Sequence, residues 1–246
     1  MQKIAIVNHK GGVGKTTSAI NLAAGLALKG KRVLLVDSDP QSNLTESFGI
    51  FSPEKDLYAS FSKGDPLPIV ALKKNLWLVP SSLDLAGVEL EIASRIARER
   101  ILLELIDRVT GSYDYCIIDC PPSLGLLTLN ALVAANEVYI PMEAEFLAYR
   151  GIDSIVGIIN QVKKHLNPQL EIRGVFFTKF NEKRVLTKEI KEQIEGFFGK
   201  NLMKTQVRVN VALAEAQSSG KDIFDYDPAS NGAADYAELV QEILKS

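Results

Sequence analysis

The sequence is poor in cysteine and contains no long apolar run. Only two cysteines, Cys116 and Cys120, occur among 246 residues, which excludes the disulfide framework of a small secreted domain. No apolar run approaches the roughly 18 residues of a membrane-spanning helix. Strand-like sequence begins at residue 3, so we expect no signal peptide. These absences predict a soluble cytoplasmic protein.

Net charge of one sign is also lacking. The chain has 28 Lys and Arg against 30 Asp and Glu, a net charge of −2, so its total charge does not indicate nucleic-acid binding. Hydrophobic residues make up 46% and charged residues 24% of the chain, as in an ordinary folded domain. The length suits one domain, residues 1–246, that can bury a large core.

A glycine-rich stretch carries the clearest chemistry: Lys10-Gly11-Gly12-Val13-Gly14-Lys15-Thr16-Thr17. It follows the apolar run 4–7 and precedes a segment, 18–27, with apolar residues at helical spacing. Strand, glycine loop and helix are the context of a phosphate-binding loop, whose backbone N–H groups point at phosphate oxygens. Lys15 can then reach the outer phosphates, and the Thr16 hydroxyl can bind Mg²⁺.

The loop departs from the general pattern G-x-x-x-x-G-K-[ST], which would place glycine at position 9. His9 stands there, and a second lysine, Lys10, opens the loop. The form K-G-G-x-G-K-[ST] resembles the deviant Walker A motif of the ParA/MinD family of ATPases. The resemblance implies ATP bound by residues 10–17, with Lys10 reaching the phosphates of the partner subunit's nucleotide.

Two further motifs follow buried strands. Residues 32–37 end in Asp37-Ser38-Asp39-Pro40-Gln41-Ser42-Asn43, and carboxylates at the ends of parallel strands lie where ligands bind. This D-x-D-P-Q-x-N resembles the family's switch I, which implies that Asp39 positions the attacking water and that Asp37 supports the Mg²⁺ shell. From the residues alone, Asp39 before Pro40 equally suits a turn.

The strand 115–119 ends in Asp119, followed by Cys120-Pro121-Pro122-Ser123. An apolar strand that ends in Asp is typical of a Walker B motif, where the carboxylate holds Mg²⁺. D-x-P-P resembles the family's version, its switch II. Cys116 and Cys120 lack the further ligands of a metal site, so we interpret both as small core residues.

The rest of the chain alternates strands and helices. This pattern predicts an α/β fold: a doubly wound, mostly parallel central sheet flanked by helices, as in a P-loop NTPase. Residues 44–75 are broken by Gly and Pro and predict short helices over a sheet edge. Further strands are expected at 76–80, 137–142, 171–178 and 203–207, and helices at 84–109, 124–135, 145–166 and 231–244.

A basic segment lies between Lys179 and Arg208, with eight Lys or Arg against four Glu. It suits either a contact with DNA phosphates or a solvated helix face. The stretch 210–221 resembles the family motif N-V-R-L-S-E-A-P-S-x-G-K, but Ala212 replaces its arginine and Arg208 stands where a proline is expected. By this resemblance, Asn181 is a base-contact candidate, and the DNA-binding candidates are Lys179, Lys183, Arg184, Lys188, Arg208 and Lys221.

The resemblance to ParA/Soj ATPases covers nearly the whole chain and implies a function. ATP and Mg²⁺ would drive formation of a homodimer that binds DNA non-specifically at the nucleoid. Hydrolysis, stimulated by a ParB-like partner, would release the DNA. Because no helix-turn-helix precedes residue 3, we expect no operator-specific repression.

Alternatives from other classes remain. The polar face of residues 235–246 is acidic, which disfavours a MinD-like ATPase that binds an anionic membrane. The two cysteines flank Asp119 and do not suit the cluster of a nitrogenase-iron-protein relative, and the chain has no tyrosine-rich tail like that of a bacterial tyrosine kinase. A related ATPase that positions a protein cargo on the nucleoid stays open.

Overall fold

A computed structural model describes residues 1–145, 148–181 and 185–245. In this part of the chain one sheet has seven strands, in the order β3-β4-β2-β5-β1-β6-β7. The strands are β1 (Gln2–Ile6), β2 (Val33–Asp37), β3 (Val70–Lys73), β4 (Leu76–Val79), β5 (Tyr115–Asp119), β6 (Glu137–Glu143) and β7 (Glu171–Thr178). All neighbouring strands are parallel except β3, which is antiparallel to β4.

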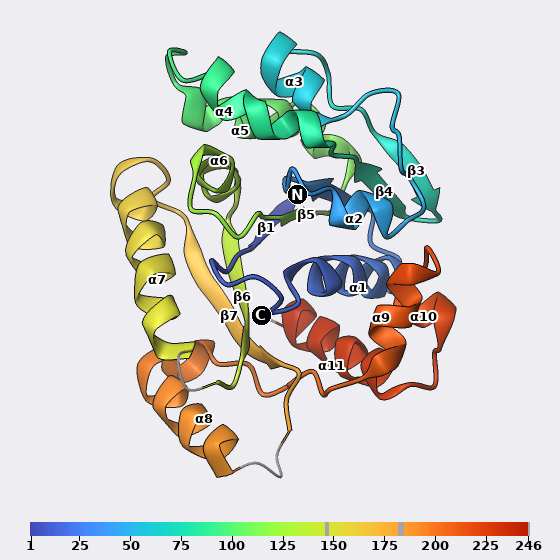
Figure 1. The fold of residues 1–246 in the computed structure, drawn as a ribbon, viewed down its shortest axis with the longest axis vertical. Helices are drawn as coiled ribbons and strands as arrows, with labels where there is room; N and C mark the ends of the chain where they lie inside the picture. Colours follow the sequence, from blue (N-terminus) through green and yellow to red (C-terminus); the bar gives the residue numbers. More distant parts are fainter. Residues whose placement is uncertain (146–147, 182–184, 246) are drawn as a thin grey trace.

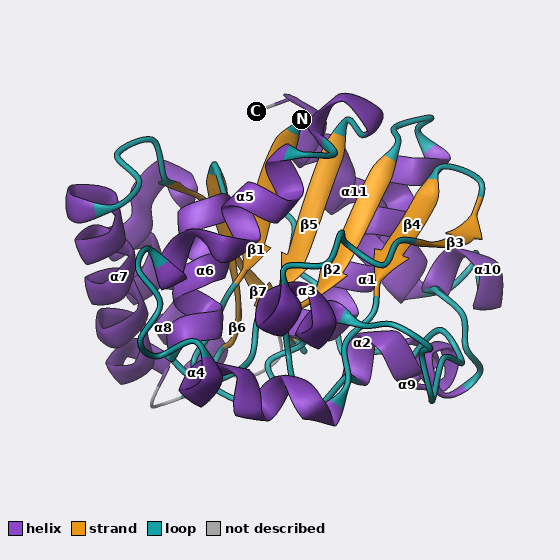
Figure 2. Cartoon of the chain, turned by 90° about the horizontal axis from the view of Figure 1, so that it is seen from above, coloured by secondary structure: helices purple, strands orange, loops and turns teal. Residues whose placement is uncertain are grey.

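Helices cover both faces of the sheet (Figures 1 and 2). The helices are α1 (Lys15–Leu28), α2 (Asn43–Glu46), α3 (Leu57–Lys63), α4 (Val88–Glu91), α5 (Ile101–Asp107), α6 (Leu126–Ala134), α7 (Ala148–His165), α8 (Val185–Phe198), α9 (Val211–Ser218), α10 (Ile223–Tyr226) and α11 (Asn231–Lys245). Short 3₁₀ turns lie at Leu83–Gly87, Arg98–Arg100, Thr110–Ser112 and Gly199–Asn201.

The core has two layers, one on each face of the sheet. Along β1, Ile4 and Ile6 join a cluster with α1, α9, α10 and α11, whereas Ala5 packs with α3, α5, α6 and α7 on the opposite face. Side chains alternate faces along a strand, so a strand covered by helices on both sides has to be apolar throughout. The predicted α/β fold with a doubly wound, mostly parallel sheet is therefore confirmed.

The structure differs from the sequence-based expectation at three places. The segment 203–207 forms no strand, although Met203 N and Val207 N donate to β7 carbonyls at 2.8 Å and single bridges join Val175 to Leu202 and Phe180 to Arg208. The ladder is interrupted between them, because Lys204 N and Thr205 N donate instead to the Glu242 carboxylate of α11, at 3.1 and 2.7 Å. The expected helix 84–109 is broken into α4, α5 and 3₁₀ turns. The short strand β3 within residues 44–75 was not predicted, although short helices were, and α2 and α3 are such helices.

The topology brings the three motifs to one edge of the sheet. β1 lies between β5 and β6, and the chain leaves it towards β2 on one side and later crosses from β5 to β6 on the other. The crevice at the carboxyl ends of such strands is the usual ligand site of open α/β sheets. In the described part of the chain, no helix is long and apolar enough to cross a membrane.

Close packing between β6 and β7 predicts a cost for one methyl group. A Cβ atom on Gly174 would lie 2.5 Å from the ring of the buried Tyr139 and 2.7 Å from the sulfur of Met203. We therefore expect Gly174→Ala to lower the free energy of unfolding by about 1–3 kcal/mol through overpacking, measured by denaturant titration.

Gly157 provides the matched control. It is exposed in α7, and a Cβ atom there would meet no atom within 4 Å. Gly157→Ala should therefore stabilise the protein by about 0.5–1 kcal/mol, since glycine weakens a helix interior. Equal stability of the two variants would contradict the packing argument.

Candidate nucleotide-binding site

The glycine loop joins β1 to α1 and is shaped by backbone conformations that favour glycine. Gly12 and Gly14 have φ of 76° and 82°, in the left-handed region that other residues rarely adopt. The loop is anchored from below, where the Thr178 hydroxyl donates to the Val13 carbonyl at 2.8 Å. Val13 is accordingly buried while Gly11 and Gly12 are exposed, so the loop presents its backbone to the surface.

The first turn of α1 is suited to an anion. No side chain caps this helix start, and its first turn holds no acidic residue, so the positive end of the helix faces the loop. Lys15 lies buried in this turn and donates from Nζ to the Lys10 carbonyl at 3.2 Å. Burial lowers the pKa of Lys15, partly offset by the negative charge of Asp119.

Strand register places two carboxylates opposite each other. Asp37 ends β2 and Asp119 ends β5, and the two residues are direct partners in the parallel ladder. Asp37 accepts from the Thr45 N–H at 2.9 Å, from the Thr45 hydroxyl at 2.6 Å and from the Asp39 N–H at 3.2 Å. Asp119 accepts from the Thr16 hydroxyl at 2.7 Å. Both carboxylates are fully buried.

This arrangement suits a cation. Burial raises the pKa of Asp37 to about 7 and raises that of Asp119 well above its ordinary range, with the charge of Asp37 adding to the effect. Among the described residues, Asp119 Oδ1 has no hydrogen-bond partner although it is buried. A hydroxyl beside an orphaned carboxylate oxygen at a phosphate loop fits Mg²⁺, which takes few protein ligands and completes its shell with phosphate and water.

Asp39 lies two residues beyond Asp37, the last residue of β2, and lines a cavity over the glycine loop. It is nearly buried, and its carboxylate accepts from the Gln41 N–H at 3.0 Å. Its backbone is held in turn, because the Ser81 hydroxyl after β4 donates to the Asp39 carbonyl at 2.9 Å. The turn interpretation and the functional interpretation of Asp39 are thus compatible.

A cavity of about 670 Å³ opens over the loop and gathers most of the predicted residues. From the sequence motifs it is lined by Gly11, Gly12, Gly14, Lys15, Thr16, Thr17 and Asp39. Residues of α2, the residue after it and residues of α9 also line the cavity, none of which was predicted as a site residue: Asn43, Glu46, Ser47, Ala214, Gln217 and Ser218. Lys10 is not among the lining residues.

Two glutamates that the sequence did not single out bind the lysines around the loop. Lys10 Nζ lies 2.5 Å from Glu145, and Lys179 Nζ lies 2.6 Å from Glu143 and 2.8 Å from the Gly12 carbonyl. The hydrogen bond from Lys10 lowers the pKa of Glu145. Both glutamates lie at or just beyond the carboxyl end of β6, so the strand-end rule that pointed to Asp37 would also have found them.

Some of the residues proposed for base and DNA contacts lie in the described part of the chain. Asn181 and Arg208 line a second cavity, of about 690 Å³, with Phe180. The Arg208 guanidinium is bound to Asp235 at 2.6 Å, while Lys221 is exposed at the end of α9. Lys183 and Arg184 lie outside the described residues, and of Lys188 only the backbone, in α8, is described.

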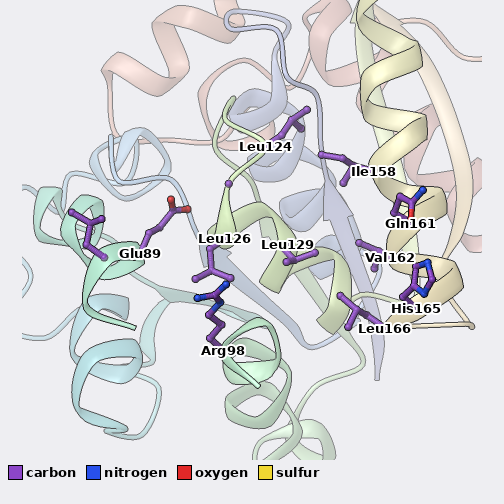
Figure 3. A pocket seen from close by; sticks show the side chains of 12 residues that line it. Glu89, Arg98, Leu124, Leu126, Leu129, Ile158, Gln161, Val162, His165 and Leu166 are labelled. Atoms are coloured by element: carbon purple, nitrogen blue, oxygen red, sulfur yellow. The ribbon is translucent and has the colours of Figure 1, made fainter. Parts of the chain in front are cut away.

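A third cavity, of about 710 Å³, contains none of the motif residues (Figure 3). It lies between residues 89–98 and the helices α6 and α7, and Figure 3 shows the side chains of Leu129, Ile158 and Val162 around it. Its mostly apolar lining offers no cradle for a triphosphate, so we place the nucleotide in the cavity over the glycine loop.

The cysteines have a structural role. Cys116 and Cys120 are both buried and unbonded to one another, and burial raises the pKa of Cys116 to about 12. In residues 1–145, 148–181 and 185–245, no three His, Cys, Asp or Glu side chains form a metal cluster. This agrees with the interpretation of both cysteines as core residues.

Comparison with known proteins agrees with this geometry. Residues 1–172 match a protein family described as an AAA domain. The chain is 43% identical over 245 residues to the sporulation initiation inhibitor protein Soj of Bacillus subtilis, covering 98% of this chain and 97% of that protein. It is 42% identical over 243 residues to the chromosome-partitioning ATPase Soj of Treponema pallidum, covering 98% and 96% of the two chains.

A solved structure from Mycobacterium smegmatis shows the same arrangement. It is described as cobyrinic acid a,c-diamide synthase with bound ADP and magnesium, and it superposes with a TM-score of 0.86 at 31% identity. The superposition covers 100% of this chain and 94% of that one. A relative of the same fold therefore binds a nucleotide and the cation that the Asp119 site suits.

The raised pKa of Asp37 predicts how stability depends on pH. Unfolded, this carboxyl titrates near 3.8, whereas in the folded protein it titrates near 7. Between these values the folded state holds the extra proton, so stability falls as pH rises and is lowest above pH 7. In magnesium-free buffer, the free energy of unfolding should fall between pH 5 and 7 in the wild type. The slope in Asp37→Asn should be shallower than the wild-type slope by about 1 kcal/mol per pH unit.

Added Mg²⁺ tests whether the buried carboxylates cause this pH dependence of stability. A cation bound beside the ionised carboxylates offsets their charge, so Mg²⁺ should stabilise the wild type more at pH 8 than at pH 5. Identical pH slopes for wild type and Asp37→Asn, measured by denaturant unfolding, would contradict the assignment.

Proposed function

Because this chain belongs to the ParA/Soj family of deviant Walker A ATPases, we propose that it is a partition ATPase that dimerises on binding ATP. The ATP dimer binds DNA non-specifically, and hydrolysis releases it. A ParB-like protein stimulates hydrolysis, and the cycle segregates a plasmid or chromosome over the nucleoid in the cytoplasm.

The position of Lys10 is the observation that supports dimerisation most directly. Lys10 Nζ lies 2.5 Å from Glu145, and the Lys10 side chain is 43% exposed. Lys10 does not line the cavity over the glycine loop, whereas Lys15 does. Lys15 therefore lines the cavity of its own subunit, while Lys10 lies exposed beside it. A displayed lysine beside a phosphate site suits a contact with the phosphates of a second subunit.

The chemistry follows from the residues around the cavity. Thr16 and Asp119, with Asp37 behind them, would hold Mg²⁺, which neutralises charge on the phosphates. Lys15, and Lys10 from the partner, stabilise the negative charge that develops on the transferred phosphoryl group, and Asp39 orients the attacking water. Asn181 contacts the base in the neighbouring cavity, while Gly11, Gly12, Val13, Gly14 and Thr17 complete the loop around the phosphates.

The membrane-associated alternative finds little support. The apolar face of α11, with Tyr236, Leu239 and Val240, is buried against α1. Two of its acidic side chains also have partners within the chain, since Asp235 binds Arg208 and Glu242 accepts from the Thr205 N–H. A helix committed in this way offers no apolar surface to a bilayer. The alternative of a protein cargo on the nucleoid keeps the same ATPase cycle and differs only in the partner.

Lys10 provides the test of the dimer. Lys10→Ala should bind a non-hydrolysable ATP analogue with an affinity within about threefold of the wild type, because Lys15 and the loop remain, yet stay monomeric in light scattering. Hydrolysis should fall at least about a hundredfold, since one charge-stabilising group is lost. Lys29→Ala, at an exposed position, should behave as wild type.

Glu145→Gln tests the same lysine by removing its ion-pair partner. The Lys10–Glu145 pair is exposed, and such pairs contribute at most about 1 kcal/mol. Freeing Lys10 should therefore strengthen the ATP dimer up to about fivefold. A Lys10→Ala variant that still dimerises with the analogue would refute the role of this lysine.

DNA binding by the ATP dimer should depend steeply on salt. The logarithm of affinity should fall linearly with the logarithm of salt concentration, because lysines at DNA phosphates release counterions. Lys188→Ala and Lys221→Ala should each reduce this slope by about one per substituted lysine in each subunit, measured by fluorescence anisotropy of a random duplex. Lys63→Ala, exposed in α3, is the control, and unchanged slopes in both variants would leave the basic segment a solvated helix face.

A further inference from the structure

Helix α9 connects the two cavities at the glycine loop. Arg208 and Val209, just before this helix, line the cavity that contains Asn181, and Gln217, at its other end, lines the cavity over the loop. The turn after α9 also approaches the turn that follows α2, since a Cβ atom on Gly220 would lie 3.8 Å from the Gly49 nitrogen. The helix therefore lies between the two cavities, with its carboxyl end at the cavity over the glycine loop.

One side chain on α9 bridges the phosphate loop and switch I. The Thr17 hydroxyl in the first turn of α1 lies 3.1 Å from Gln217 Oε1. Gln217 Nε2 lies 3.4 Å from the Ser47 hydroxyl, which in turn donates to the Asn43 carbonyl at 2.6 Å. Ser47 is buried and follows directly on α2. A chain of polar groups thus runs from the phosphate cavity to the helix that follows Asp39.

The direction of this chain is set at one end. A carbonyl only accepts hydrogen bonds, so the single Ser47 proton goes to Asn43 and the Ser47 oxygen must accept from Gln217 Nε2. The amide then turns Oε1 to Thr17, which has to donate. With its only proton on Gln217, the Thr17 hydroxyl cannot donate to a phosphate oxygen.

We propose that Gln217 is a positioning residue that couples a phosphate group at Thr17 to switch I. A phosphate oxygen accepts a hydrogen bond from the Thr17 hydroxyl, so the Gln217 amide has to reverse. Nε2 then donates to Thr17 and Oε1 accepts from the Ser47 hydroxyl. The hydrogen bond from Ser47 to the Asn43 carbonyl is lost. Switch I responds because Ser47 adjoins α2, whose Thr45 holds Asp37. The inference rests on the proposed ATPase function and concerns the step that brings Asp39 into place.

This link belongs to the present chain. The family motif that residues 210–221 resemble has a proline at position 217, and a proline side chain neither donates nor accepts a hydrogen bond. Gln217, half-buried and facing the cavity, therefore adds a polar connection that the motif lacks.

Two variants of Gln217 test the coupling. The expected result for Gln217→Leu is a single-turnover hydrolysis rate about fivefold lower at saturating Mg²⁺ and ATP, the effect of losing about one net hydrogen bond. Affinity for a non-hydrolysable ATP analogue should stay within twofold, because Thr17 is then free to donate to phosphate. Gln217→Glu has the same shape and can still accept from Ser47, but it cannot make the donation to Thr17 that the reversed amide makes in the nucleotide-bound state. Its rate should therefore fall as well, which a packing role would not produce.

A double-mutant cycle identifies the path. Ser47→Ala should lower the rate by a similar factor, and Ser47→Ala with Gln217→Leu should be no slower than either variant alone. Gln241→Leu, the same substitution at an exposed position of α11, should match the wild type. Wild-type rates in both Gln217 variants, or losses that multiply to about 25-fold in the double variant, would overturn the coupling alone. A wild-type protein that does not bind the analogue would instead refute the ATPase function.

Discussion

The constraint on which the structure depends is the burial of two negative charges side by side. Asp37 and Asp119 end adjacent parallel strands in register, and both are fully enclosed. Like charges in such a place are costly unless a cation or protons offset them. Neighbouring groups reduce this cost. Asp37 accepts three hydrogen bonds and Asp119 accepts one from the Thr16 hydroxyl, and the charge of Lys15 acts to lower the pKa of Asp119. Asp119 Oδ1 is left without a hydrogen-bond partner among the described residues, and a cation that accompanies phosphates fits there.

Around this buried centre, the exposed lysines beside the glycine loop form ion pairs with neighbouring glutamates. Glu145 holds Lys10 and Glu143 holds Lys179, on either side of the glycine loop. Exposed pairs of this kind are weak, so a stronger anion such as a triphosphate can compete for the lysines at little cost. A dimer that exchanges Lys10 between subunits needs that weakness, because a lysine locked in a strong pair could not cross the interface.

Helix α9 lies between the cavity that contains Asn181 and the cavity over the glycine loop. Arg208 and Val209, just before the helix, line one cavity, residues of the helix line the other, and Gln217 joins the first turn of α1 to the segment after Asp39. The residues proposed to bind phosphate and the segment after Asp39 are thereby linked through polar contacts. Side-chain amides suit such a link because one group carries both a donor and an acceptor.

The sequence by itself determined the fold class and the chemistry of the three motifs. Glycines, lysines and strand-end carboxylates have a local meaning, since strand, loop and helix follow from neighbouring residues. The tertiary structure alone decided which distant groups meet. Ser47 and Gln217 come from other elements, and no local pattern pairs them with the loop. The strand-end rule could have pointed to Glu143 and Glu145, but not to the lysines that they bind. It also decided that residues 203–207 form no strand and that Val70–Lys73 do, because pairing depends on which backbone groups a neighbour offers; Glu242 of α11 takes the N–H of Thr205.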